Sequence, residues 1–86
     1  MKKLVIVGCG RLAGIVSDAV VNGLLPEYDL VGVYSRTAEK AERIVAKIQQ
    51  HGKTCMACTT IEDLLALKPD YLVEAASLSL IHISEP

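Results

Sequence analysis

Residues 4–14 of the chain read LVIVGCGRLAG, and this stretch decides the fold. Leu4 to Val7 form a short apolar run rich in β-branched residues, which is typical of a buried strand. From Arg11 to about Gly23 apolar residues recur at helical spacing, which predicts a helix. Its apolar stripe would consist of Leu12, Ile15, Val16, Ala19, Val20 and Leu24. Only two glycines and a cysteine separate strand from helix, so the chain turns from one into the other almost at once.

Strands and helices keep alternating along the rest of the chain. The expected order is a strand at 29–35, a helix that Thr37 caps and Gly52 ends, a strand at 54–59, a short helix at 61–67 and a strand at 70–75. Such alternation places parallel strands in one sheet, joined by right-handed crossovers. The sequence therefore predicts an α/β fold, a truncated doubly wound parallel sheet of the Rossmann type with strand order 3-2-1-4.

The turn after the first strand fits the pattern G-x-G-x-x-G/A, with Ala13 at the last position. Gly8 suits the tight turn, Gly10 lets the backbone approach a pyrophosphate, and Ala13 lets the helix pack closely on the strand. The start of the helix adds free N–H groups and the positive end of a dipole. This context indicates a dinucleotide site rather than a turn that merely needs glycines. The residues expected at the cofactor are Gly8, Cys9, Gly10, Arg11 and Leu12.

The end of the second strand should distinguish NAD from NADP. An acidic residue there would accept a hydrogen bond from the ribose 2′-hydroxyl of NAD, but this chain has Ser35, Arg36 and Thr37. Arg36 can stack on adenine or hold a 2′-phosphate, with two hydroxyls beside it. These three residues favour NADP over NAD as the cofactor. The alternative is that Arg36 is a solvated loop residue and Thr37 only caps its helix.

Composition excludes several other classes of partner. The 86 residues make at most one small domain, and a net charge of −1 provides no basic field for nucleic acid. No stretch approaches the roughly 20 apolar residues of a membrane span, and the first apolar run is shorter than the about 7–15 residues of a signal-peptide core. We therefore expect a cytoplasmic protein with a small-molecule partner, no nucleic acid and no membrane.

The three cysteines are expected to be reduced, because the chain has no export signal. Cys55 and Cys58 match C-x-x-C, but residues three apart in a strand point to opposite faces. No second cysteine pair completes a zinc site, and His51 is expected at a helix C-terminus. The sequence thus predicts no metal site.

Three motifs together resemble the N-terminal part of the L-aspartate dehydrogenase family. They are GCGRLAG at 8–14, VYSRT at 33–37 and PDYLVEAAS at 69–77. The family is related to two-domain dehydrogenases that include the glucose-fructose oxidoreductases. The resemblance implies that Ala75 and Ala76 pass close to the nicotinamide half of the cofactor, whereas Glu74 is more often solvated or paired than catalytic.

The resemblance also implies a function for the parent protein, which would be a homo-oligomer that transfers hydride between the Cα of an amino acid and the nicotinamide. Its small-molecule substrate would be L-aspartate or oxaloacetate. Its substrate domain and catalytic residues would lie beyond Ser77, so this chain contains no catalytic residue and is expected to be inactive alone. The alternatives are a non-catalytic NAD(P)-sensing module and a sugar or polyol oxidoreductase of the related group. Truncation is also expected to leave Val5, Val7, Leu72 and Val73 without cover on one face of the sheet.

Residues 78–86, LSLIHISEP, have neither a cap nor a helical stripe. The codons CTG TCT CTT ATA CAC ATC TCC GAG CCC of a transposase adapter for sequencing libraries translate to the same nine residues. We therefore expect residues 1–77 to be a partial dinucleotide-binding domain and 78–86 a non-native tail, which is excluded from fold reasoning. The alternative is a genuine edge strand.

Overall fold

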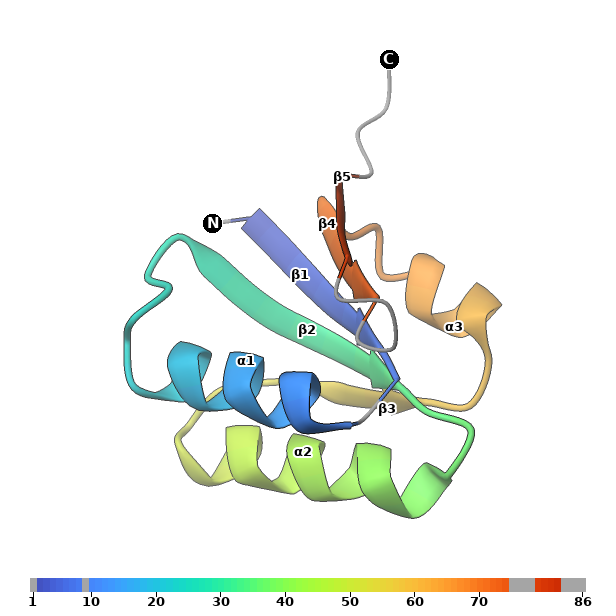
Figure 1. Cartoon of the computed structure of the whole chain (residues 1–86), viewed down its shortest axis with the longest axis horizontal. Helices are drawn as coiled ribbons and strands as arrows, with labels where there is room; N and C mark the ends of the chain where they lie inside the picture. Colours follow the sequence, from blue (N-terminus) through green and yellow to red (C-terminus); the bar gives the residue numbers. More distant parts are fainter. Residues whose placement is uncertain (1, 9, 75–78, 83–86) are drawn as a thin grey trace.

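The computed structural model describes residues 2–8, 10–74 and 79–82, and Figure 1 shows how they are arranged. Strands and helices alternate through most of the chain, as the sequence predicts. The elements are β1 (Lys2–Val7), α1 (Arg11–Val21), β2 (Tyr28–Tyr34), α2 (Ala38–Gln50), β3 (Met56–Cys58), α3 (Ile61–Leu65), β4 (Tyr71–Glu74) and β5 (Ser79–His82).

The sheet has the strand order β3-β2-β1-β4-β5. Its first four strands are parallel, which confirms the predicted α/β fold and the order 3-2-1-4. Two hydrogen bonds place β4 beside β1: the backbone N–H of Asp70 donates to the carbonyl oxygen of Lys3 at 2.9 Å, and the N–H of Lys3 donates to Oδ2 of Asp70 at 2.8 Å. From β1 the chain adds β2 and β3 on one side of the sheet and then crosses to add β4 on the other side. In parallel sheets of this kind, ligands bind at the carboxyl ends of the two strands where the direction changes, here β1 and β4.

The fifth strand goes beyond the predicted order. β5 pairs antiparallel with β4, with Leu72 opposite Ile81 and Glu74 opposite Ser79. Residues 79–82, which belong to the expected tail, thus extend the sheet beside β4. This is the arrangement that the alternative prediction, an edge strand, describes. The pairing is made by backbone groups and does not test where the segment comes from.

Side chains of β1 alternate between two hydrophobic clusters, one on each face of the sheet. Leu4 and Ile6 belong to the cluster under α1 and α2, whereas Val5 packs with Leu64 of α3. Figure 1 shows α1 and α2 side by side, with α3 away from them. Lys47 of α2 joins the first two helices through an ion pair of 2.6 Å with Asp18 of α1.

The second helix follows its sequence pattern closely. Its buried residues are the expected Ala41, Ile44, Val45 and Ile48. His51 is its C-cap, as predicted, and its Nδ1 lies 3.0 Å from the carbonyl oxygen of Lys47. Thr37 does occupy the N-cap position, but its side chain makes no capping hydrogen bond. A capping hydroxyl is present at α3 instead, where Thr60 Oγ1 accepts a hydrogen bond from the N–H of Asp63 at 3.0 Å.

The apolar stripe predicted for the first helix is partly wrong. Ile15 is 57% exposed, and the buried residues of α1 are Ala13, Ser17 and Val20. Small residues let this face of α1 approach the sheet closely. The buried Ser17 hydroxyl has its hydrogen-bond partner within the helix, because it donates to the carbonyl oxygen of Gly14 at 2.9 Å. Leu24 is 71% exposed because it lies beyond Asn22, the C-cap of α1.

The expectation that truncation uncovers four strand residues is also wrong in part. Val5 is completely buried, and Val73 is only 7% exposed. Leu64 of α3 covers Val5, although α3 has only five residues. Val7 and Leu72 are half-buried.

Candidate functional site

The glycine turn after β1 begins at Gly8, whose backbone conformation suits the tight turn that the sequence predicts. Gly8 has φ 89°, in the left-handed region that favours glycine, and its N–H donates to the carbonyl oxygen of Tyr34 at 2.7 Å. α1 begins at Arg11, and Ala13 in its first turn is completely buried between helix and sheet. A larger side chain at Ala13 would push the helix away, so this residue serves the close packing expected of the motif's last position.

The start of α1 offers backbone donors to a ligand. Gly10 is the N-cap, and as a glycine it has no side chain that could cap the helix. Gly10 is exposed, and a Cβ built on it would meet nothing within 4 Å, so the space beside it is open. The first N–H groups of a helix have no partner within the helix and carry its positive dipole end. A phosphate group could therefore approach the backbone of this turn directly.

Three strands end next to this turn. Val7 of β1 lies opposite Tyr34 of β2 on one side and opposite Glu74 of β4 on the other. Because these strands are parallel, their carboxyl ends share one edge of the sheet. The loop after β2 is thereby held beside the glycine turn.

The residues expected to choose the cofactor lie in this loop. Ser35 Oγ accepts a hydrogen bond from the N–H of Thr37 at 3.2 Å, which closes the loop onto the start of α2. Arg36 between them is exposed, and in the part of the chain that the structure describes its guanidinium has no ion-pair partner. The structure thus brings the loop and the glycine turn to the same edge of the sheet.

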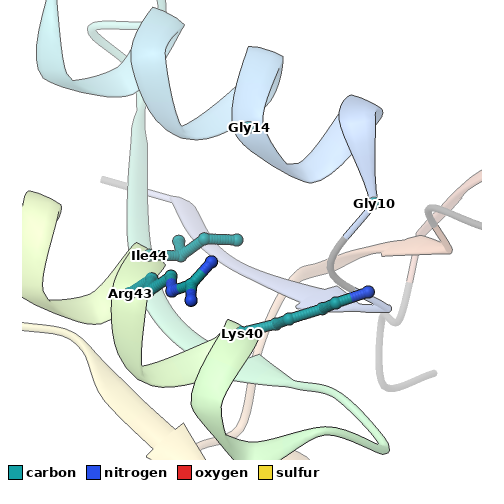
Figure 2. Close-up of a pocket in the computed structure, with 5 residues that line it drawn as sticks. All are labelled: Gly10, Gly14, Lys40, Arg43 and Ile44. Atoms are coloured by element: carbon teal, nitrogen blue, oxygen red, sulfur yellow. The ribbon is translucent and has the colours of Figure 1, made fainter.

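A hollow of about 260 Å3 lies between α1 and α2. Its lining consists of Gly10 at the N-cap of α1, Gly14 of α1, and Lys40, Arg43 and Ile44 of α2. Figure 2 shows both cationic side chains on the α2 side. Sequence reasoning missed Lys40 and Arg43. The signal that could have found them is their spacing of three on the helix after the cofactor-selecting loop, which places both on one face of that helix.

Three of the expected site residues lie outside the described part of the chain, namely Cys9, Ala75 and Ala76. Arg11 is exposed and Leu12 is half-buried, both in the first turn of α1.

The two other cysteines sit in opposite hydrophobic clusters, as the strand argument predicts. Cys55 belongs to the cluster under α1 and α2, and Cys58 to the cluster under α3. Burial raises the pKa of the Cys55 thiol to about 12, and it also raises the pKa of Cys58, with a smaller contribution from Asp63. Both are therefore protonated and unreactive at neutral pH.

Within residues 2–8, 10–74 and 79–82, no three His, Cys, Asp or Glu side chains are grouped so that they could hold a metal ion. Over the same described ranges, no helix has the length and apolar character that crossing a membrane requires.

Comparison with known proteins finds similarity to L-aspartate dehydrogenases. The chain is 34% identical over 85 residues to the L-aspartate dehydrogenase of Methanocaldococcus jannaschii and 26% identical over 81 residues to that of Methanococcus maripaludis strain C7. No protein-family model matches the chain, and no solved structure gives a significant match. Both alignments cover 94% of this chain, which is a larger share than residues 1–77 make up. Both alignments therefore include some of residues 78–86. The chain spans 28% of the length of each of these relatives, so it is similar to a part of an L-aspartate dehydrogenase.

Proposed function

We propose that residues 1–77 are the partial nucleotide-binding domain of an NAD(P)-dependent L-aspartate dehydrogenase. The observation that carries this proposal is the uncapped start of α1 with open space beside Gly10, at the edge where β1, β2 and β4 end. Backbone donors at a helix N-terminus, reached over a glycine, suit the pyrophosphate of a dinucleotide. The similarity to two L-aspartate dehydrogenases supports the choice of family.

Each part of the site would then contact a different part of the cofactor. The pyrophosphate would lie on the turn formed by Gly8, Cys9, Gly10, Arg11 and Leu12. The adenosine ribose would lie against the loop of Ser35, Arg36 and Thr37. Ala75 and Ala76 would pass the nicotinamide half. NADP is favoured over NAD, because Arg36 stands where a carboxylate would bind the 2′-hydroxyl of NAD.

The activity would belong to the full-length parent. When bound, the nicotinamide exchanges a hydride with the substrate, here the Cα of L-aspartate. Groups that bind and orient the aspartate would lie beyond Ser77, as the relatives are more than three times longer than this chain. The 86 residues alone should bind nucleotide without turning over aspartate.

Gly10→Asp tests the proposal, with binding of NADP+ and NAD+ followed by isothermal titration calorimetry. Aspartate is a better N-cap than glycine by roughly a few tenths of a kcal/mol, so the free energy of unfolding should be maintained or rise slightly. Its carboxylate would fill the open space and repel the pyrophosphate, so both cofactors should bind at least about tenfold more weakly.

Thr60→Asp is the matched control, because it places the same charge at the N-cap of α3 and keeps a capping oxygen. It should leave both affinities unchanged. Failure of the unmodified chain to bind either cofactor, or equal binding by Gly10→Asp, would exclude the proposed site.

A further inference from the structure

A second hollow lies on the face of the sheet that α3 covers in part. Its volume is about 280 Å3. Lys3 of β1 and Asp29 of β2 line it near the amino ends of their strands, whereas the glycine turn follows the carboxyl end of β1. The complete lining consists of Lys3, Asp29, Val31, Thr54, Met56 and Leu67. We call it the α3-side hollow, and it is separate from the candidate cofactor site in both face and end of the sheet.

The sequence of β2 shapes this hollow. The pairing of β1 with β2 shifts between Leu4 and Val5, which leaves Val31 as an extra residue in β2. Val31 packs with the hydrophobic cluster on the α3 side. The next residue, Gly32, has no side chain, and Leu67 fills that space, since a Cβ built on Gly32 would lie 2.5 Å from Cδ1 of Leu67. The floor of the hollow is therefore apolar.

This apolar floor is partly open to solvent. Val31 and Leu67 are half-buried, and Met56 beside them is 53% exposed. An apolar group of a ligand placed here would remove these side chains from water, which favours binding.

Two opposite charges stand next to each other beside the floor. Lys3 and Asp29 are directly opposite residues in the pairing of β1 with β2. Within the part of the chain that the structure describes, the Lys3 ammonium and the Asp29 carboxylate form no ion pair and no side-chain hydrogen bond. Neighbouring strands are only about 4.8 Å apart, so one small ligand could reach both charges. The hollow thus offers a cation, an anion and an apolar surface at once.

We propose that the α3-side hollow binds a free α-amino acid with an apolar side chain, such as L-leucine. Its carboxylate pairs with Lys3, its ammonium group pairs with Asp29, and its side chain lies on the apolar floor. A volume of about 280 Å3 is slightly below the roughly 300–1,000 Å3 of pockets for drug-sized molecules, which suits a ligand of this size. The proposal does not depend on the dinucleotide site.

The test is a titration of the 15N-labelled 86-residue chain, in which NMR follows the backbone amides of residues that line the hollow. L-leucine should shift these amides with a dissociation constant on the order of 1 mM, because the hollow is open and its charges are solvated. Two analogues each lack one charge: 4-methylpentanoate has no ammonium group, and 3-methylbutylamine has no carboxylate. Each should bind about fivefold more weakly than L-leucine, since one ion pair is lost.

Two variants assign the charges of the ligand to the two residues. Asp29→Asn should weaken L-leucine about fivefold and leave 4-methylpentanoate, which has no ammonium group to lose, within about twofold. Lys3→Gln should likewise weaken L-leucine and leave 3-methylbutylamine nearly unchanged. A variant that only disturbed the fold would weaken L-leucine and the analogue together. Glu42→Gln, on the exposed side of α2, is the control and should change none of the affinities.

Each outcome either supports or overturns the proposal. Selective weakening of L-leucine by Asp29→Asn and by Lys3→Gln supports it. No shift of these amides with up to about 20 mM L-leucine, or equal weakening of L-leucine and 4-methylpentanoate in Asp29→Asn, overturns it. If the same amides shift on dilution of the chain and not with L-leucine, the hollow is a contact between two copies and the proposal is wrong. Binding of NADP+ or NAD+ is measured separately and leaves these conclusions unchanged.

Discussion

The backbone N–H of Gly8 lies 2.7 Å from the carbonyl oxygen of Tyr34 and donates a hydrogen bond to it. This bond joins the turn after β1 to the last residue of β2. The next residue is Ser35, so the bond fixes the cofactor-selecting loop relative to the glycine turn. Any change that tilts the turn should therefore affect both stability and nucleotide binding.

Gly8→Ala is expected to lower the free energy of unfolding by about 1–2 kcal/mol, because φ 89° is strained for a residue with a Cβ. Urea denaturation followed by circular dichroism measures the change. Gly14→Ala is the control: it lies inside α1, and an added Cβ would meet nothing within 4 Å. That variant should gain up to about 1 kcal/mol from helix propensity. Equal free energies of unfolding for the two variants would contradict the positive φ of Gly8 in this turn.

Gly32 of β2 lies close to α3 and the residues after it. An added Cβ would lie 2.5 Å from Cδ1 of Leu67 and 2.9 Å from Cδ1 of Leu64. Leu64 is completely buried and has little room to move. Gly32→Ala should therefore cost about 1–3 kcal/mol of stability by overpacking.

A double variant tests whether this cost comes from the named contact. Leu67→Ala removes the nearest atom, so Gly32→Ala should destabilise the Leu67→Ala chain less than it destabilises the original one. Additive effects of the two substitutions would place the cost elsewhere.

The Cys55 thiol should make stability depend on pH in the alkaline range. Its pKa is raised to about 12, chiefly by burial and to a lesser extent by the charges of Cys58 and Asp29, from 9.0 for an ordinary thiol. A raised pKa favours the neutral thiol in the folded state, so the resulting stability is fully present below pH 9 and is lost as the pH rises toward 12. Cys55→Ala should reduce the fall in unfolding free energy between these pH values.

Alkylation provides a second measurement for the same thiol. With iodoacetamide at pH 9, peptide mapping should find Cys55 unmodified in the folded chain and modified in urea. Rapid labelling of Cys55 without denaturant would contradict its burial.

Arg36→Ala tests the loop side of the cofactor preference in the full-length parent. If the guanidinium binds the 2′-phosphate, the affinity for NADPH should fall by about 1.5–3 kcal/mol and that for NADH should stay nearly unchanged. Fluorescence titration of the reduced cofactors measures both. A similar loss for both cofactors would mean that Arg36 contacts the adenine, or another part that they share.

Sequence periodicity predicted the elements well where one side of a helix is apolar and the other charged. The stripe of α2, from Ala41 to Ile48, is buried as expected because charged residues occupy its outer face. α1 has apolar residues on more than one face, so periodicity could not show that Ala13 and Ser17 would be buried while Ile15 would be exposed. That choice depends on how closely the helix approaches the sheet.

The sequence predicted only those parts of the candidate site that consist of residues next to one another in the chain. The glycine motif and residues 35–37 each follow the end of a strand, so strand order alone places them at one edge. Lys40 and Arg43 enter the site through the packing of α2 beside α1, a contact between helices that no spacing rule for one helix contains.

The contribution of β5 to the free energy of unfolding can decide whether residues 78–86 are a native strand or a non-native tail. The alignments that run past Ser77 favour a native strand, whereas the nine residues match a translated adapter. Backbone pairing alone is close to neutral, because each hydrogen bond contributes about 0.5–1.5 kcal/mol net and ordering each residue costs about 1–2 kcal/mol. A native strand would add side-chain burial worth about 1.5–3 kcal/mol for each apolar residue that it covers.

We expect a non-native tail, and therefore expect deletion of residues 78–86 to change the free energy of unfolding by less than about 1 kcal/mol. Thermal melting of the two chains should then differ by less than roughly 4–8 °C. Deletion of residues 83–86 alone is the control, since it shortens the tail and keeps β5. The opposite result would be a loss of about 2 kcal/mol or more in the free energy of unfolding on deletion of residues 78–86, with no loss on deletion of residues 83–86. In that case β5 buries apolar surface of the sheet as a native strand does, and the non-native origin is wrong.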